Sequence, residues 1–281
     1  MSKLKIVVVL KTDNTTTQDN SAGKQTHASQ LNSSHVYKIQ EMLSKHVTID
    51  YEFLCLTNIE LNCKTIPLEY NHWGWWNKLQ LYKIPGPVFY MDIDTIITDN
   101  IDDILNELSG REFSMYLKPI DLKQYNKEME TPDKIYKRRW TEHLKSALMY
   151  WSGDVSFLWN HFYNLRFFDI LDRYSNRRTP NWDKVNDDGE LTPGHVWPEM
   201  RGDQAAVSFI MLNNYKNIFT PLARKAPSPD PEYFNFPIGS FKRDVLPLTY
   251  ENVDISEILS KFKIVQFHGT PRPYEQDIIP Y

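Results

Sequence analysis

GPVFYMDIDTIITDNIDD, residues 86–103, leads from an apolar segment directly into a group of acidic residues. The run of apolar and aromatic side chains predicts a buried strand over residues 88–94. Asp92 and Asp94 stand two apart where the run stops, and side chains at that spacing in a strand point the same way. Neighbouring carboxylates raise each other's pKa, so a cation is expected between them. Mg²⁺ and Mn²⁺ prefer such oxygen ligands, and the pair is therefore a candidate metal site.

The alternative for this D-x-D pair is a surface turn that the two Asp residues simply cap. The neighbouring residues favour burial, because a hydrophobic strand precedes the pair and Thr95, Ile96 and Ile97 follow it. Buried carboxylates need partners. The pair also stands at the carboxyl end of a strand, and ligands of open α/β sheets bind beyond such ends. These features favour a metal site over a surface turn.

Outward from this stretch, strands and helices alternate along the chain. Short apolar runs predict strands over residues 3–10 and 49–57. Helical spacing of apolar residues predicts helices over 34–47 and 74–84, and Ser34 is the expected cap of the first. The resulting β-α-β-α-β order predicts an α/β fold, with a mainly parallel sheet and helices on both of its faces.

The pattern is looser after residue 95, and two further helices and four strands are expected there. A single domain is predicted for residues 1–281, with a nucleotide-binding half of about 1–110 and an acceptor half of about 111–281. The predicted helices cover 155–171 and 203–214, and the predicted strands cover 112–119, 147–152, 217–222 and 263–269.

The composition is that of an ordinary soluble globular protein, with 41% hydrophobic and 24% charged residues among 281. A net charge of −4 argues against a general nucleic-acid binder, which usually has a basic excess. Cys55 and Cys63 lack metal-type spacing and suit a reducing compartment as thiols. The apolar run IVVVL near the start is too short to cross a bilayer, and no signal-peptide pattern precedes it. A soluble, cytoplasmic protein is therefore expected.

Four stretches in order resemble the GT-A-fold glycosyltransferases, and within them the glycogenin-like (family 8) group and its viral and bacterial relatives with a D-x-D motif. The resemblance covers roughly residues 3–275, is weak over 118–200, and implies the Rossmann-like GT-A fold. The stretches are KIVVVL (5–10), GWWNKLQLYKIPGPVFYMDIDTIITDNIDDIL (74–105), RGDQAAVSFIM (201–211) and KIVQFHGTPRPYE (263–275), of which the second is the most specific.

The resemblance implies a metal-dependent transfer of a sugar from a nucleoside-diphosphate sugar, with UDP as the expected nucleotide and retention as the expected stereochemistry. Asp92 and Asp94 match the carboxylates that hold Mn²⁺ or Mg²⁺ on the donor diphosphate, and His268 matches the third protein ligand. Gly269 directly after His268, and Arg272 where the family often has Lys, are departures that put the phosphate contacts in doubt. An Arg at this position can still neutralise phosphate.

Further donor contacts follow from position. The resemblance places the nucleobase and ribose at the end of the first strand, at Leu10, Lys11 and Thr12, although an ordinary strand exit is equally compatible. Lys78 precedes the metal strand on a helix and is a candidate phosphate contact, the alternative being a solvated lysine. Gly269 and Arg272 complete the expected donor site.

Asp203 and Gln204, at the start of a predicted helix, are the candidate catalytic residues, for steadying the cationic sugar carbon or orienting the acceptor. Asp203 is also compatible with a plain helix cap.

For the acceptor, basic residues with interleaved rings over 134–145 and 173–182 suit a polyanion, such as a modified base in viral-type DNA, as an alternative to a glycan. A solvated charged face is the simpler explanation of these segments. The candidate acceptor contacts are Lys137, Arg138, Arg139 and Trp151.

Two other functions are compatible with the pattern. A nucleotidyltransferase also needs paired carboxylates, but usually has a Gly-rich basic loop after its first strand, and the loop here is Thr- and Asn-rich. A non-catalytic nucleotide- or glycan-binding protein would not need Asp92, Asp94 and His268 together.

Overall fold

The computed structural model of the protein describes residues 2–12, 31–70, 74–117, 144–164, 203–215, 217–220, 222–223, 237–241, 245 and 254–267. None of the helices in these ranges has the length and apolar character that a membrane-spanning helix requires.

In this part of the chain, seven strands form one large sheet in the order β3-β2-β1-β4-β7-β6-β8. The pairs β3-β2, β2-β1, β1-β4 and β6-β8 are parallel, and β7 is antiparallel to both β4 and β6. The predicted mixed, mainly parallel sheet is therefore confirmed. Its strands are β1 Leu4–Leu10, β2 Tyr51–Thr57, β3 Thr65–Pro67, β4 Val88–Met91, β6 Phe113–Leu117, β7 Leu144–Trp151 and β8 Leu222–Ala223.

Three short strands of the described residues form a second sheet in the order β5-β10-β9. β10 (Ile264–Gln266) runs antiparallel to β5 (Thr95–Ile97) and parallel to β9 (Ile238–Ser240). Asp92, Ile93 and Asp94 connect β4 of the large sheet to β5 of the small one. The D-x-D motif is therefore the link between the two sheets.

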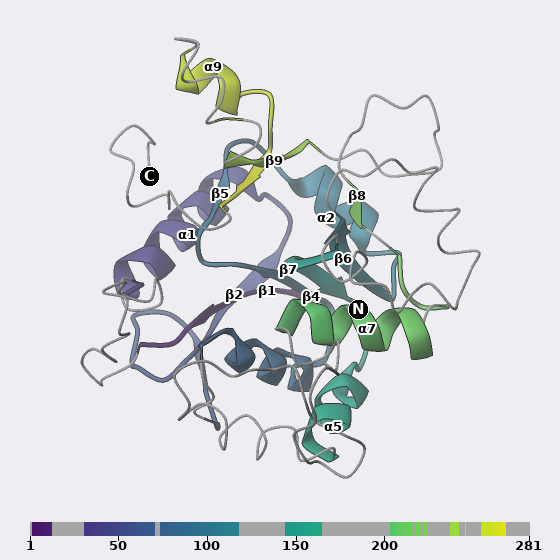
Figure 1. Ribbon diagram of the computed structural model, residues 1–281. Coiled ribbons are helices and arrows are strands. Elements are labelled where there is room, and N and C mark those ends of the chain that lie inside the picture. Colours follow the sequence, from purple (N-terminus) through teal and green to yellow (C-terminus); the bar gives the residue numbers. More distant parts are fainter. Residues whose placement is uncertain are drawn as a thin grey trace, which may run out of the picture.

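Helices cover both faces of the large sheet (Figure 1), as the alternation of elements predicts. Adjacent residues of β1 face opposite sides: Val7 belongs to one core and Ile6 and Val8 to the other. The helices of the first core are η2 Gly74–Lys83, α5 Ser156–Asn164 and α7 Asp203–Asn214. Those of the second are α1 Ser33–His46, α2 Asp102–Leu108 and α9 Ile255–Leu259.

Several predicted elements differ in their ends or type. The helix predicted for 74–84 is a 3₁₀ helix, η2, and α1 is capped by Asn32 rather than by Ser34. The Asn32 side chain accepts a hydrogen bond from the Ser34 N–H at 2.9 Å, the usual role of an N-cap amide. The C-terminal part of the helix predicted for 155–171 lies outside the described residues beyond Asn164.

The strand predicted for 88–94 ends at Met91, and this changes the argument for the acidic pair. Asp92 N–H donates to the Ala147 carbonyl oxygen at 2.8 Å, and Thr95 N–H then donates to the Asp92 carbonyl oxygen at 3.1 Å. Asp92 to Thr95 therefore form a turn. The inference that strand geometry points Asp92 and Asp94 the same way is wrong, because Asp94 is not part of an extended strand.

The strands predicted for 217–222 and 263–269 are also shorter than expected. Residues 217–218 form a turn, and β8 begins only at Leu222. β10 covers Ile264–Gln266, and residues from 268 onward lie outside the described part of the chain.

Candidate functional site

The candidate site lies at the carboxyl edge of the large sheet, where β1 and β4 end side by side. The two strands are parallel, with Val7 opposite Tyr90, so the residues that follow both strands leave the sheet at the same edge. Thr12 is held there by Asn58, whose Oδ1 accepts from the Thr12 N–H at 2.9 Å and whose Nδ2 donates to the Thr12 carbonyl oxygen at 2.6 Å. Residues 10–12 thus lie at the edge expected for a nucleotide, and their contact with a donor stays a prediction.

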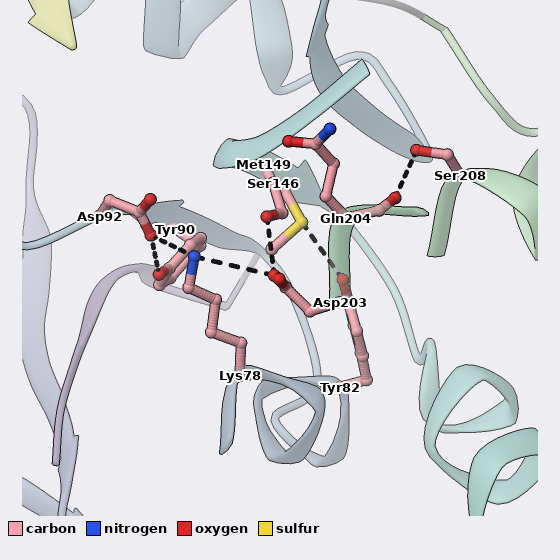
Figure 2. Close-up of polar contacts among 9 residues, drawn as sticks. All are labelled: Lys78, Tyr82, Tyr90, Asp92, Ser146, Met149, Asp203, Gln204 and Ser208. Atoms are coloured by element: carbon pink, nitrogen blue, oxygen red, sulfur yellow. Dashed lines mark hydrogen bonds and ion pairs between the residues drawn. The ribbon is translucent and has the colours of Figure 1, made fainter. Parts of the chain in front are cut away.

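Lys78 connects two carboxylates that are far apart in the sequence. Its Nζ lies 2.7 Å from Asp92 Oδ1 and 3.7 Å from Asp203 Oδ2 (Figure 2). Asp92 follows β4, Lys78 comes from η2, and Asp203 is the first residue of α7. Three elements therefore converge on one ion-paired cluster, which we call the lysine cluster: Lys78, Asp92 and Asp203.

Each carboxylate of the lysine cluster also accepts a hydroxyl group. Tyr90 OH donates to Asp92 Oδ1, and Ser146 Oγ on β7 donates to Asp203 Oδ2 at 2.7 Å (Figure 2). These bonds fix one oxygen of each carboxylate. The Tyr90–Asp92 hydrogen bond could have been predicted from the sequence, because the two residues stand two apart at a strand end. The Ser146–Asp203 hydrogen bond could not, because no local sequence pattern indicates it.

Burial and the two carboxylates have opposite effects on the pKa of Lys78. The Lys78 side chain is only 17% exposed, and this burial lowers its pKa. The charges of Asp203 and Asp92 outweigh burial, and the net effect raises the pKa of Lys78 above its ordinary value. Burial, reinforced by the charge of Asp92, raises the pKa of Tyr90 well above its ordinary value. At neutral pH Asp92 thus accepts hydrogen bonds from the ammonium of Lys78 and from the neutral phenol of Tyr90.

The candidate catalytic pair is placed at the site by the start of α7. Asp203 is buried, and its carboxylate faces Ser146 and Lys78, which is more than a helix cap requires. Gln204 follows it, and its carbonyl oxygen accepts a hydrogen bond from Ser208 Oγ at 2.6 Å within the helix. The catalytic roles of both residues stay predictions.

The prediction that Trp151 contacts an acceptor is wrong. The side chain is fully buried in β7, and its Nε1 donates to the Ile84 carbonyl oxygen at 2.9 Å. Its ring packs against Tyr82 and Phe113, with centroids 5.6 and 6.4 Å apart. Trp151 is therefore a core residue. The other acceptor candidates, Lys137, Arg138 and Arg139, lie outside the described residues, as do His268, Gly269 and Arg272.

The acidic turn after β4 supplies the candidate metal ligands. Asp92 uses Oδ1 for Lys78 and Tyr90, which leaves Oδ2 for another cation, and Asp94 is buried two residues later. Carboxylate oxygens of this kind fit Mg²⁺ or Mn²⁺. Within the described ranges, no group of three or more His, Cys, Asp or Glu residues is placed to hold a metal. A cation here would therefore need other ligands besides the two carboxylates.

No protein-family model and no curated protein matches the chain. Three solved structures that do match are glycosyltransferases, the class that the sequence resembles. GlyE of Streptococcus pneumoniae TIGR4 is 11% identical, with a TM-score of 0.44, and the match covers 99% of this chain and 58% of GlyE. The galactosyltransferase LgtC, solved with donor and acceptor sugar analogues, is 13% identical, with a TM-score of 0.43, and the match covers 98% of this chain and 90% of LgtC. The bifunctional glycosyltransferase WbbM is 9% identical, with a TM-score of 0.46, and the match covers 97% of this chain and 47% of WbbM. Similarity at these identities and TM-scores transfers no function, so the residues of this chain have to support one.

Proposed function

We propose that the protein is a metal-dependent glycosyltransferase that takes its sugar from a nucleoside-diphosphate sugar, UDP being the expected nucleotide. The observation that supports this most is the lysine cluster, which gathers charged residues from three elements at the carboxyl edge of the sheet. Ligands of open α/β sheets bind at this edge. Asp92 belongs both to this cluster and to the D-x-D turn, so a cation held by the turn would lie next to Lys78 and Asp203.

In this proposal the role of each residue follows from its position in the fold. Residues 10–12, at the end of β1, contact the nucleoside. Asp94 and the remaining oxygen of Asp92 would hold the cation at the diphosphate, with His268 as the third ligand that the family resemblance implies. Lys78 fixes Asp92 and Asp203 relative to each other through its two ion pairs. Asp203 and Gln204 face the sugar from the start of α7.

The chemistry that this arrangement serves is cleavage of the bond between the sugar carbon and the diphosphate. A bound divalent ion stabilises the charge that develops on the departing diphosphate. The sugar carbon becomes cationic at the same time, and a fixed carboxylate such as Asp203 stabilises a neighbouring positive charge. The family resemblance favours a retaining outcome.

The experiment that tests the proposal is hydrolysis of a panel of nucleoside-diphosphate sugars, with Mn²⁺ and with EDTA. We expect slow release of one nucleotide by the wild-type protein in Mn²⁺, and its loss in EDTA and in Asp94→Asn. Asp99→Asn is the matched control, because Asp99 is an exposed carboxylate five residues further along the same segment. Equal activity of Asp94→Asn and Asp99→Asn would exclude the metal role of the D-x-D turn.

A complete absence of hydrolysis calls for calorimetric titration of the same nucleotides with Mn²⁺. A transferase that needs its acceptor still binds its donor nucleotide, whereas failure to bind any nucleotide would reject the proposal. The identified donor then allows the two predicted acceptor classes to be compared. Duplex DNA that shifts in a gel at low salt and dissociates steeply as salt rises would support a DNA acceptor; no shift at low salt would leave glycans.

A further inference from the structure

A row of polar side chains crosses the small sheet next to the D-x-D turn. Gln266 at the end of β10 pairs with Thr95 of β5 on one side and with Ser240 of β9 on the other. Residues that are paired across neighbouring strands project from the same face of a sheet. Thr95 directly follows Asp94, so the row lies one residue from the candidate metal ligands.

Two members of this row are buried without a hydrogen-bond partner. Gln266 is 1% exposed and Thr95 is fully buried. Among the described residues, neither Gln266 Oε1, Gln266 Nε2 nor Thr95 Oγ1 has a hydrogen-bond partner. A buried amide or hydroxyl without a partner lowers the free energy of unfolding. The two side chains are therefore costly unless another group binds to them.

The next row of the same sheet shows that polar residues are not required by the fold. Ile264, two residues before Gln266, pairs with Ile97 of β5 and Ile238 of β9, and all three isoleucines are buried. Residues two apart in a strand share a face, so this apolar row continues the face that carries the polar one. Leu or Met at position 266 would satisfy packing without leaving a buried amide unpaired.

We infer that Gln266 is a ligand, through its Oε1, of the divalent cation held by Asp94, and that the Thr95 hydroxyl faces the same cation or its bound water. This inference rests on the proposed function and assigns a residue that the sequence did not select. Gln266 and Thr95 would add a carboxamide and a hydroxyl oxygen to the carboxylate of Asp94. Oxygen donors of this kind suit Mg²⁺ and Mn²⁺ better than Zn²⁺, which prefers nitrogen and sulfur ligands.

The test measures Mn²⁺ binding directly, by the electron paramagnetic resonance signal of the free ion, in the presence of the nucleotide that the donor panel identifies, or of UDP. We expect Gln266→Met to weaken Mn²⁺ binding at least tenfold. We expect its melting temperature in EDTA to equal or exceed that of the wild type, because the unpaired buried amide is gone. Gln266→His should bind Zn²⁺ more tightly relative to Mn²⁺ than the wild type does.

Gln80→Met is the matched control. Gln80 is also a buried glutamine, but its Oε1 accepts from the backbone N–H groups of Glu69 and Tyr70 at 2.9 and 3.1 Å. This variant should show the opposite pattern: a lower melting temperature in EDTA and unchanged Mn²⁺ affinity.

The outcomes separate this inference from the proposed function. Mn²⁺ binding that Asp94→Asn abolishes and Gln266→Met leaves unchanged would overturn the inference and keep the metal-dependent function. In that case Gln266 and Thr95 hold an internal water. A wild-type protein that binds the nucleotide but no Mn²⁺ would overturn both the cation of the proposed function and its ligand Gln266.

Discussion

Lys78 is the residue on which the candidate site depends most. Its single positive charge faces two carboxylates, those of Asp92 and Asp203. The lysine therefore lowers the energetic cost of placing the carboxylates of Asp92 and Asp203 close together in a partly buried site.

Replacing Lys78 by Met should leave two carboxylates facing each other without their counter-ion. Removing one partner of a buried ion pair typically costs about 3–5 kcal/mol, and partial exposure places Lys78→Met at the lower end, about 3 kcal/mol at pH 7. Urea unfolding at pH 7, followed by tryptophan fluorescence, measures this loss.

Lys83→Met is the control for that substitution, on the same helix. Lys83 pairs with Glu69 at the surface, where side chains of the two residues are 33% and 56% exposed, and exposed pairs contribute at most about 1 kcal/mol. Equal losses in Lys78→Met and Lys83→Met would mean that the lysine cluster is no more than a surface ion pair.

At the scale of elements, Asp102 fastens the start of α2 to the chain that follows α1. Its carboxylate accepts from the Thr48 N–H at 3.0 Å, from Thr48 Oγ1 and from Asn100 Nδ2 at 3.1 Å. Its slight burial raises the pKa, but the hydrogen bonds from Thr48 and Asn100 outweigh burial and leave the pKa of Asp102 below its ordinary value of 3.8. A carboxylate with a lowered pKa stabilises the fold above its unfolded pKa and loses this effect as pH falls through the folded one.

Asp102→Asn should therefore lower the free energy of unfolding by about 1 kcal/mol at pH 7, since an amide replaces a charged acceptor of several hydrogen bonds. The difference from the wild type should shrink as pH falls below 3.8 and through the lower pKa of Asp102 in the folded protein. Asp103→Asn is the neighbouring control, because the Asp103 side chain is 57% exposed and pairs with Lys263. Urea titrations at pH 7 and pH 3.5 compare the three proteins, and a pH-independent loss would contradict this role.

The elements that the sequence predicted well are those whose pattern is local. β1 is found where an uninterrupted apolar run predicts a strand, and α7 where the sequence predicts a helix. The parallel order of the first strands follows from the alternation of strands and helices along the chain. The end of β4 was missed because the apolar and aromatic run carries no signal for the turn that the Thr95 N–H closes on the Asp92 carbonyl oxygen. The antiparallel entry of β7 between β4 and β6 was not predicted, because strand order depends on long-range pairing.

The site was predictable to the extent that its residues follow recognisable elements. Asp92, Lys78 and Asp203 were selected from the ends and faces of predicted strands and helices, and they meet in the structure. Ser146 and Gln266 were not selected, because the role of each depends on a contact with a residue of another strand or helix. Trp151 was selected for its residue type, and burial then excluded it.

At the scale of the whole molecule, both sheets combine strands from the two predicted halves of the chain. β4 pairs with β7 in the large sheet, and β5 pairs with β10 in the small one. The D-x-D turn between β4 and β5 is therefore positioned by partners from the later part of the sequence. Any displacement of β7 relative to β4 should therefore move the D-x-D turn as well as lower the overall stability.

Gly86 tests this coupling, because the loop before β4 meets the end of β7 there. Its N–H donates to the Gly153 carbonyl oxygen at 2.8 Å, and a Cβ at this position would lie 2.4 Å from the Ser152 carbonyl carbon and 2.5 Å from the Trp151 oxygen. These are backbone atoms that cannot rotate away, so Gly86→Ala has to separate β4 from β7. We expect the free energy of unfolding in urea to fall by about 3 kcal/mol, at the upper end for overpacking, together with weaker Mn²⁺ binding.

Gly153→Ala is the control across the same contact. A Cβ at Gly153 would meet nothing within 4 Å, and the expected change in the free energy of unfolding is within about 1 kcal/mol. Similar stability of the two variants would show that the loop before β4 yields without disturbing the sheet, and that the two halves are less firmly coupled than their shared strands imply.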